Sequence, residues 1–387
     1  DNYYTNMDSD VQNEILSGRL TVHTTTEAQT VVNKILLYEK APDLTDSLWF
    51  INACLIANED YYTYPPPPYG DDSIYWSDVR HAKGLMLANG YNTIDTLSKL
   101  LGNNASTVIA RTNLGRAFVL YRGCGTNNWY SPFSVEPNQL QNGTKLPIVL
   151  SCTCGTIGTG STSAAAERWL LTGTPTVPRG AAGYFATTTS GSNIAHLRSA
   201  VSKGFFNAVF QQGVRTFGEA CEGGRQNVYN LYNSTSEYRG FTTLGDPEMN
   251  IWTAIPRPLD VACDSQLAAG EDSLVVRVYS QEVPFESALV CVLFDTLLYE
   301  YGFTAGDGRI TFVLNDLDSG YVQITVTGRN KIPYLDSIPI VSTNVEELKQ
   351  PTATDRFSIT IQPNPFTKLT TVSFGIAHSA ERIELKI

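Results

Sequence analysis

Apolar and polar positions along residues 1–255 alternate between helical and strand periods. Apolar side chains three and four positions apart predict an amphipathic helix over 26–38. A continuous apolar run at 48–57 is typical of a buried strand, and a Pro-rich loop over 64–69 leads to a second predicted helix at 76–89. Helices that alternate with buried strands indicate an α/β domain with a largely parallel sheet.

Two further apolar runs, 116–121 and 146–151, each lead into a short loop that contains a cysteine. The first loop presents Cys124 between two glycines, and the second presents Cys154 before a glycine. The loops are about 30 residues apart, the length of one crossover unit, so the two strands should be parallel neighbours. Because functional sites form at the carboxyl ends of such strands, we expect the two loop tips to face each other.

The pattern changes near residue 256. Short alternating runs over 256–342, such as SLVVRVYS and YVQITVTG, predict a small antiparallel β-sandwich. Residues 343–355 are polar, contain a proline and suit a linker. A further β unit begins at 356–387, and it is too short to close a core alone.

Composition narrows the class of protein. With 387 residues, 42% of them hydrophobic and 17% charged, the chain can bury a substantial core. A net charge of −11 argues against a nucleic-acid partner, which would require a concentrated basic surface. No apolar run approaches the roughly 20 residues of a membrane span, and the N-terminus lacks the regions of a signal peptide.

The seven cysteines form no recognisable framework. Cys152 and Cys154 have one residue between them, which fits neither a zinc CxxC pair nor a regular set of disulfides. A thiol in a loop after a buried strand is a candidate nucleophile, since backbone N–H groups there can stabilise a thiolate and an oxyanion. The alternative for Cys154 is a free cysteine that serves as a small core residue.

Four motifs carry a family resemblance. They are ILLYEK at 35–40, YRGCG at 121–125 with Trp129 shortly after, LPIVLSCTC at 146–154, and GDPE at 245–248. Together they resemble the gingipain class of cysteine peptidases. The resemblance implies a caspase-like three-layer α/β sandwich with a largely parallel sheet, and cleavage of protein or peptide substrates through a Cys–His pair.

The resemblance also implies roles for individual residues. Cys154 takes the position of the nucleophile, and Cys124 stands where the family carries its catalytic histidine. The backbone N–H groups of Gly125 and Cys154 would form the oxyanion hole. No cofactor is required for this chemistry.

Three more positions match the family. Glu59 corresponds to the acidic residue that assists the histidine. Asp78 falls where arginine-specific members place the carboxylate that receives a basic side chain, and Trp129 belongs to the same substrate-binding region. The alternatives are ordinary surface roles, with Asp78 capping its helix.

At position 124 the sequence differs from the family, and this difference bears most directly on catalytic activity. A thiol titrates near 8.5 and lacks the second nitrogen of imidazole, and general acid–base catalysis typically contributes about 10² to 10⁴ in rate. Three explanations stay open: a natural pseudo-peptidase, a substitution introduced to stop self-cleavage, or a disulfide to Cys154 or Cys152. A metal site on these three cysteines lacks a recognisable fourth ligand, and His81 is the one histidine that could approach the pocket rim.

The resemblance extends beyond the catalytic region. Residues 8–20 match an interior part of that region, so a separated N-terminal segment of the same precursor is an expected partner. Residues 256–342 resemble an immunoglobulin-like domain, and residues 356–387 resemble the start of a C-terminal sorting domain, which implies secretion or a bacterial cell surface. The family commonly binds structural calcium, here expected at Asp71-Asp72 or at Glu59-Asp60.

Two functions therefore compete. The first is a secreted cysteine endopeptidase of the gingipain type, impaired because position 124 is a cysteine. The second is a non-catalytic surface or assembly protein that keeps the peptidase scaffold, because a fold does not fix a function.

Overall fold

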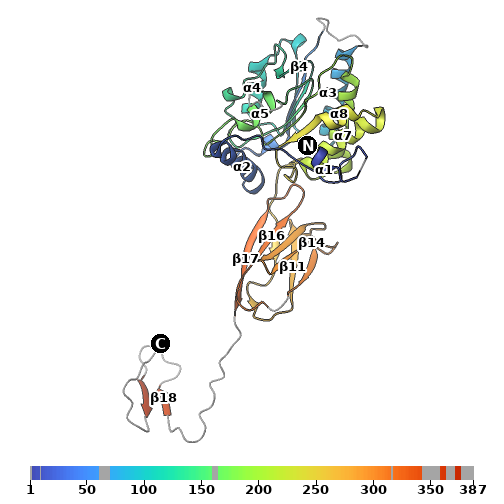
Figure 1. The fold of residues 1–387 in the computed structure, drawn as a ribbon. Coiled ribbons are helices and arrows are strands. Elements are labelled where there is room, and N and C mark those ends of the chain that lie inside the picture. Colours follow the sequence, from blue (N-terminus) through green and yellow to red (C-terminus); the bar gives the residue numbers. More distant parts are fainter. Residues whose placement is uncertain are drawn as a thin grey trace.

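The computed structural model shows an α/β body followed by a two-sheet β-sandwich (Figure 1). It describes residues 2–8, 10–60, 70–158, 164–314, 317–341, 358–362 and 371–375. The predicted loop at 64–69 and the predicted linker at 343–355 lie outside this part of the chain.

A six-stranded sheet forms the centre of the α/β body, in the order β2-β1-β3-β6-β7-β8. Neighbouring strands are parallel except for the pair β7 and β8, which is antiparallel. The strands are β1 (Asn52–Ala57), β2 (Thr93–Ser98), β3 (Phe118–Arg122), β6 (Ile148–Cys152), β7 (Gly183–Thr187) and β8 (Phe241–Leu244). The largely parallel α/β sheet predicted from the sequence is confirmed.

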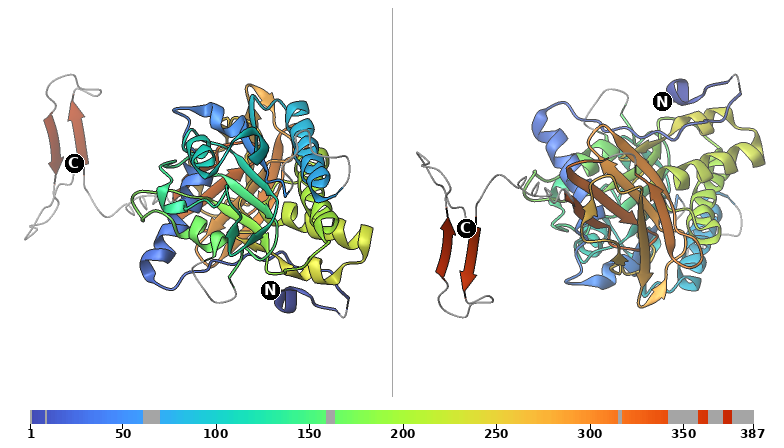
Figure 2. Two further views of the ribbon diagram at one scale, coloured as in Figure 1. Left: turned by 90° about the horizontal axis from the view of Figure 1, so that it is seen from above. Right: turned by 90° about the horizontal axis from the view of Figure 1, so that it is seen from below.

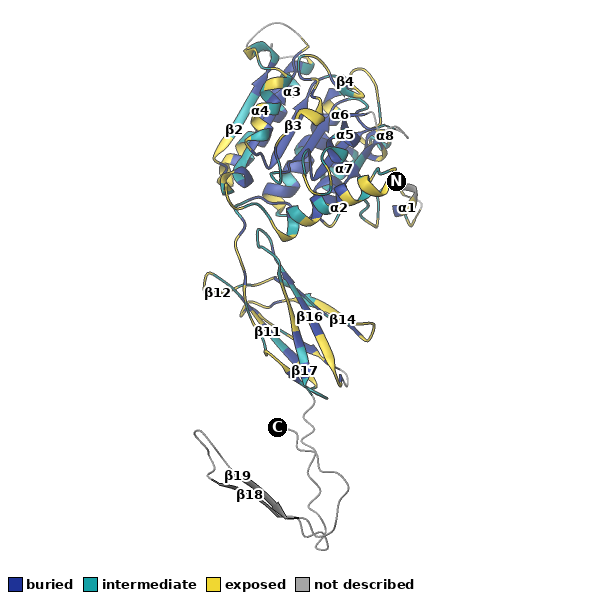
Figure 3. Ribbon diagram, turned by 90° about the vertical axis from the view of Figure 1, so that its left-hand side faces the viewer, coloured by how far each residue is buried: buried dark blue, intermediate teal, exposed yellow. Residues whose placement is uncertain are grey.

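Helices cover both faces of this sheet, because successive strand residues point to opposite sides. Leu55, Leu120 and Leu150 belong to one hydrophobic cluster, while Ile56 and Val149 belong to another. The first cluster includes residues of α3 (Asp71–Ala88), α6 (Ala195–Asn207) and α7 (Phe217–Tyr232), and the second includes residues of α4 (Ala105–Asn113) and α5 (Ala165–Leu171). Figure 3 shows the resulting buried centre, and Figure 2 shows the same layers from above and below.

The remaining elements of the α/β body are short or lie at its ends. They are α1 (Asn2–Thr5), α2 (Thr25–Lys40), α8 (Thr235–Gly240), η1 (Ser47–Ile51), η2 (Lys99–Leu101), η3 (Pro137–Gln139), η4 (Ala208–Gln212), β4 (Gly125–Thr126) and β5 (Asn128–Trp129).

The first predicted helices are confirmed, with different bounds. Helix α2 covers the predicted 26–38, and α3 begins five residues before the predicted residue 76, because Asp71 and Asp72 supply an acidic first turn. The run at 48–57 is a strand only from Asn52, since Trp49 and Phe50 lie in the 3₁₀ turn η1 and are buried there. An apolar run alone does not distinguish a buried turn from a buried strand.

Residues just after the N-terminus lie along the β8 edge of the sheet. Arg19 N donates to Thr243 O at 2.9 Å, Gly245 N donates to Arg19 O at 3.0 Å, and Arg19 forms a parallel bridge with Leu244. Gly18 lies so close to this edge that an added Cβ would stand 2.1 Å from the carbonyl oxygen of Gly245. The edge is therefore partly covered by the chain itself.

The predicted β runs after residue 256 are confirmed as a sandwich of two sheets around one core. One sheet has the order β10-β17-β16-β13-β14, the other the order β12-β11-β15 with β9 beside β11. Among these described strands, β10 and β17 pair in parallel and the other pairs are antiparallel. The strands are β9 (Asp260–Ala262), β10 (Leu267–Ala268), β11 (Ser273–Ser280), β12 (Val283–Pro284), β13 (Leu289–Phe294), β14 (Leu298–Phe303), β15 (Arg309–Val313), β16 (Gly320–Thr327) and β17 (Tyr334–Val341).

One turn of the sandwich binds the end of the α/β body. The Asn330 side chain accepts from Thr253 N at 2.8 Å and from Ala254 N at 3.1 Å, and its amide donates to the Thr253 hydroxyl. Arg329 donates to the carbonyl oxygens of Val209 and Gly213 at 3.0 and 3.2 Å. The two parts are therefore joined by side-chain contacts as well as by the connecting segment.

Two strands are described beyond the sandwich. They are β18 (Ser358–Gln362) and β19 (Thr371–Gly375), which pair antiparallel, as the predicted β unit requires. None of the helices in the described ranges combines the length and apolar character that a membrane crossing needs.

Candidate active site

The adjacent strands β3 and β6 bring the two cysteine loops together. Arg122 pairs with Cys152 in the strand register, and Cys124 and Cys154 each follow two residues later. Both cysteines line one pocket of about 260 Å³. The prediction that the two loop tips face each other is confirmed.

The backbone holds the Cys124 loop in one shape. Gly123 has a φ of 153°, and a Cβ there would lie 2.7 Å from the Cβ of Asn58, so the position requires glycine. The Tyr121 hydroxyl donates to Cys124 O at 2.6 Å, and Tyr130 N donates to the same oxygen at 3.2 Å. These contacts fix the backbone conformation of the loop that carries the side chain of residue 124.

The Cys124 thiol faces an acidic group. Its Sγ lies 3.8 Å from Asp60 Oδ2 and 3.9 Å from the Tyr75 hydroxyl, which also donates to Asp60 at 3.3 Å. Burial raises the pKa of Cys124 to about 11, and the negative charge of Asp60 contributes to this increase. At neutral pH the residue at the expected position of the general base is therefore a protonated thiol.

The Cys154 thiol has a different environment. Its Sγ lies 2.9 Å from Nη1 of Arg198 and 3.7 Å from the carbonyl oxygen of Gly191. Arg198 reaches it from α6, and the residue is only 4% exposed. A cation is thus the nearest charged partner of the proposed nucleophile.

Glu59 does not reach either thiol. Its carboxylate accepts hydrogen bonds from Trp76 Nε1 at 2.9 Å, from Lys99 N at 3.1 Å, and from the Ser98 hydroxyl, and the side chain is buried. The acidic group that faces the Cys124 thiol is the next residue, Asp60, whose own pKa burial raises. The sequence carries two acids in tandem here, and the family motif does not tell which one turns toward the site.

Asp78 is occupied by the protein itself. Its carboxylate forms an ion pair with Arg122 Nε at 2.6 Å, lies 3.6 Å from Lys203 Nζ, and accepts from the Ser199 hydroxyl. Asp78 is 1% exposed, and it does not line the pocket. The alternative of a helix cap is also not observed, since α3 begins at Asp71.

Trp129 is a core residue. Its ring stacks on Tyr121, with centroids 4.6 Å apart, and its Nε1 donates to the Ser151 hydroxyl at 2.9 Å. With 1% of its surface exposed, it packs against residues of β3 and β6 and does not line the pocket. Gly125 is buried beside Thr153, whose side chain would contact an added Cβ at 3.0 Å.

Several residues that line the pocket were not predicted from the sequence. They are Arg198, the segment 191–195 at the start of α6, Arg122, Asp71 and Tyr75. Arg198 lies in a helix 44 positions after Cys154, and no local pattern connects the two residues. Only the packing of α6 against the sheet brings them together.

No described histidine lines the pocket. His81 Nε2 lies 2.7 Å from Asn207 Oδ1, which holds its ring between α3 and the end of α6. His196 packs its ring edge against Tyr232, with centroids 5.1 Å apart. His23 lies near α2, and His378 is outside the described residues. The expected approach of His81 to the pocket rim is not observed.

All seven cysteines are free thiols in the structure, so neither Cys152 nor Cys154 is bonded to Cys124. Cys152 is fully buried, and burial raises its pKa to about 12, which disfavours the thiolate that a metal would need.

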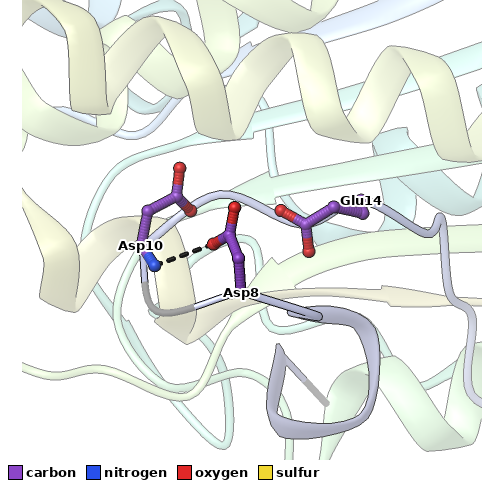
Figure 4. Close-up of side chains that lie close together, drawn as sticks. All are labelled: Asp8, Asp10 and Glu14. Carbon is purple, nitrogen blue, oxygen red and sulfur yellow. Dashed lines mark hydrogen bonds between the residues drawn. The ribbon is translucent and has the colours of Figure 1, made fainter.

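Among the described residues, one acidic group could hold a metal ion. Asp8, Asp10 and Glu14 are exposed, and their ligand oxygens lie within 4.8 Å of one another (Figure 4). Carboxylate oxygens are the ligands that calcium prefers. The pairs named from the sequence are not part of this group, and Asp72 instead accepts from Asp60 N at 2.7 Å.

Comparisons with known proteins agree with this arrangement. The curated protein gingipain R2 of Porphyromonas gingivalis is 22% identical over 357 residues, which cover 88% of this chain and 46% of that protein. The chain thus spans about half the length of this relative. Among solved structures, the Arg-specific cysteine proteinase gingipain R superposes with a TM-score of 0.76 at 19% identity, over 88% of this chain and 79% of that one.

A second solved structure gives the same result. The complex of the pro- and mature domains of RgpB from Porphyromonas gingivalis has a TM-score of 0.76 at 19% identity, over 88% of this chain and 80% of that one. These likenesses confirm the caspase-like α/β fold.

The sequence profile of peptidase family C25 matches residues 1–252, the part that contains the sheet and both cysteine loops. The chain therefore belongs to peptidase family C25.

Proposed function

We propose that the protein is a cysteine endopeptidase of the gingipain type, with Cys154 as nucleophile, and that its peptidase activity is impaired because Cys124 replaces the general base. The observation that carries this proposal is the shared pocket of the two cysteines. In that pocket Cys124 is a protonated thiol, which contacts Asp60 and has a pKa of about 11.

The chemistry separates into two steps of unequal difficulty. A thiolate at Cys154 can attack a peptide carbonyl, with the N–H groups of Gly125 and Cys154 proposed to stabilise the oxyanion. The amine can then leave only if it receives a proton. Imidazolium supplies it readily near neutral pH, whereas a thiol with a pKa of about 11 is a far weaker acid.

A Cys124→His variant tests the proposal. Asp60 already lies at the thiol that the imidazole would replace, so the new ring would have an acidic partner. We expect cleavage of fluorogenic peptides to rise by about 10² to 10⁴ over the parent. A Cys154→Ala change in the same variant should abolish that gain.

Equal activity of parent and Cys124→His, or activity that survives Cys154→Ala, would overturn the assignment of the pair. The competing proposal is a non-catalytic protein that binds partners through the peptidase scaffold. It is favoured by the lack of any histidine among the described pocket residues. It would gain support if Cys124→His stayed inactive while the Cys154 thiol remained open to alkylation.

The family resemblance implied that the Asp78 carboxylate would receive a basic side chain of the substrate, which requires Asp78 to line the pocket. Because Arg122 occupies that carboxylate, Asp78 supplies no support for a basic preference in this chain. We therefore propose protein or peptide substrates without naming the preferred residue.

Further proposals rest on the family resemblance. We propose that residues 256–342 form an immunoglobulin-like domain, that 356–387 begin a sorting domain, and that the protein is secreted or held at a bacterial surface.

A separated N-terminal segment of the same precursor is a proposed partner, which is consistent with the known complex of pro- and mature domains of RgpB. Structural calcium, which the resemblance implies, is also a proposal, and melting with and without a chelator tests it.

A further inference from the structure

Arg198 is fixed in one orientation beside the Cys154 thiol. Its Nη2 donates to Thr189 O at 3.2 Å, and its Nε lies 3.5 Å from Glu237 Oε2. Glu237 is itself held, since its other oxygen accepts from the Thr189 hydroxyl at 2.7 Å. These contacts leave Nη1 directed at Sγ of Cys154, 2.9 Å away.

A guanidinium in this position has a restricted set of chemical roles. It carries a permanent positive charge, and it neither accepts nor releases a proton at physiological pH. A cation beside a cysteine favours the thiolate, which is the nucleophilic form of the side chain. Arg198 can therefore activate Cys154, but it cannot protonate a leaving group.

No other charged group described at the site contacts the Cys154 sulfur as Arg198 does. Arg122 also lines the pocket, but its guanidinium is engaged by Asp78 and by two backbone carbonyls, those of Cys152 and Ala195. Asp71 lines the pocket but is an anion, and Asp60 contacts the Cys124 thiol. Arg198 is the cation whose hydrogen bond reaches the sulfur.

We propose that the Arg198 guanidinium, 2.9 Å from Sγ of Cys154, stabilises the negative charge of the attacking sulfur and gives the protein a second activity, the capture of acyl groups from activated esters, whose leaving group departs without a proton. This inference rests on the proposed function for the assignment of Cys154 as nucleophile. In the family resemblance, one Cys–His pair both activates the nucleophile and protonates the leaving amine. In this chain, Arg198 would assist the first step, and none of the described pocket residues would perform the second.

The reaction balances with the groups present. Sγ of Cys154 attacks the ester carbonyl, a C–S bond forms, and the C–O bond breaks with release of a phenolate anion. The product is a thioester on Cys154. Hydrolysis of this thioester requires an activated water, and Cys124 is too weakly acidic to supply its thiolate as a base near pH 7. Acyl-enzyme therefore accumulates after one rapid turnover.

The test uses the whole chain and the p-nitrophenyl ester of an N-acetylated amino acid at pH 7. The parent should release a rapid burst of about one nitrophenolate per protein, followed by slow turnover, and mass spectrometry should find the acyl group on Cys154. Arg198→Gln should slow the burst by about tenfold or more, and Arg198→Lys should restore part of the rate through its charge.

Matched variants distinguish the effect of losing the Arg198 charge from an effect of destabilising the fold. Arg168→Gln removes an arginine that pairs with Glu136 outside the pocket, and it should leave the burst unchanged. Because Arg198→Gln leaves Glu237 buried without its cation, an Arg198→Gln/Glu237→Gln double variant is included, and it should also show the slow burst. Alkylation of Cys154 by iodoacetamide provides a second rate, with the same order of reactivity expected.

The outcomes distinguish this inference from the proposed function. Equal burst and alkylation rates in the parent and in the folded Arg198 variants would overturn the role of Arg198. A parent without a burst, together with a Cys124→His variant that cleaves peptides, would overturn the inference and leave the proposed function standing. A burst that persists in Cys154→Ala would overturn both.

Discussion

At the scale of single residues, the two arginines that line the pocket are each paired with a buried carboxylate of the protein. Arg122 and Asp78 form an ion pair in which both side chains are 1% exposed or less. Arg198 and Glu237 form a second buried pair, and Asp60 contacts a thiol. Such groups are tolerated inside a protein only when their partners are present.

Removing one member of the first pair should destabilise the whole domain. Asp78→Asn leaves the Arg122 guanidinium buried beside a neutral amide, so the free energy of unfolding should fall by about 3–5 kcal/mol. Denaturant titration measures this. Asp46→Asn, which breaks the exposed pair with Lys145, serves as control and should cost about 1 kcal/mol or less.

A double variant sharpens this prediction. Asp78→Asn combined with Arg122→Met removes both charges, and it should recover part of the lost stability. If Asp78→Asn alone were as stable as the parent, the pair would not have the structural role assigned to it here.

The reactivity of Cys124 should increase steeply with pH. With its pKa near 11, about a thousandth of the thiol is ionised at pH 8, so alkylation should be slow there and faster at pH 9.5. Asp60→Asn removes a negative charge that raises this pKa, and the variant should react faster at pH 9. Mass spectrometry of the Cys124 peptide gives the rates, and the exposed Asp46→Asn should not change them.

The candidate site was predictable from the sequence only in part. Cys124 and Cys154 follow buried strands, and that pattern predicts their meeting. Whether Glu59 or Asp60 turns toward the thiol depends on the hydrogen bonds that Trp76 and Ser98 offer to one of them. These partners come from other elements, and no spacing along the chain encodes them.

At the scale of elements, glycines allow α6 and α7 to pack closely. An added Cβ at Gly204 would lie 2.5 Å from the Cβ of Asn227 and 2.6 Å from the carbonyl oxygen of Gly223. Both contacts are shorter than packed atoms allow. The crossing of α6 and α7 therefore requires glycine at position 204, and α6 is the helix that carries Arg198 to the pocket.

Two glycine-to-alanine changes should have opposite effects on stability. Gly204→Ala should lower the free energy of unfolding by about 1–3 kcal/mol, because the helices must separate. Gly84→Ala lies in α3 with open space around the added Cβ, so its higher helix propensity should stabilise the protein by up to about 1 kcal/mol. Thermal melts of the two variants test the contrast, and a loss of stability in both would contradict it.

The elements themselves follow from hydrophobic pattern where the pattern is long. Helix α2 has 16 residues and a capping box at Thr24 and Glu27, and its position was predicted to within two residues at each end. The pattern was ambiguous in the short run at 48–57, where two bulky aromatics turn before the strand begins. Tertiary burial of those aromatics decided the bounds.

At the scale of the whole molecule, the α/β body and the sandwich share a polar junction. Asn330 accepts from two successive backbone N–H groups, those of Thr253 and Ala254, and Arg329 donates to two carbonyls. Interfaces of this polar kind between domains permit relative motion when their hydrogen bonds are lost.

Asn330→Ala should loosen this junction without unfolding either part. Two backbone N–H groups would lose their partner, so a protease should cut near residues 253–258 faster than in the parent. The pocket of the two cysteines should retain its reactivity toward iodoacetamide at Cys154. Asp307→Ala, in an exposed turn of the sandwich, should leave the cleavage rate unchanged, and an equal rate in the two variants would refute the prediction.

The side chain of Arg122 has one further consequence. It begins on β3 and reaches Asp78 on α3, the carbonyl of Cys152 on β6 and the carbonyl of Ala195 on α6. An opening that separates these elements must break all these contacts of the buried charge together, so we expect its free-energy cost to be high. Amide hydrogens of the strand ends beneath the cysteines should therefore exchange with solvent deuterium only through global unfolding, and the site should lose its shape in a single step with the core.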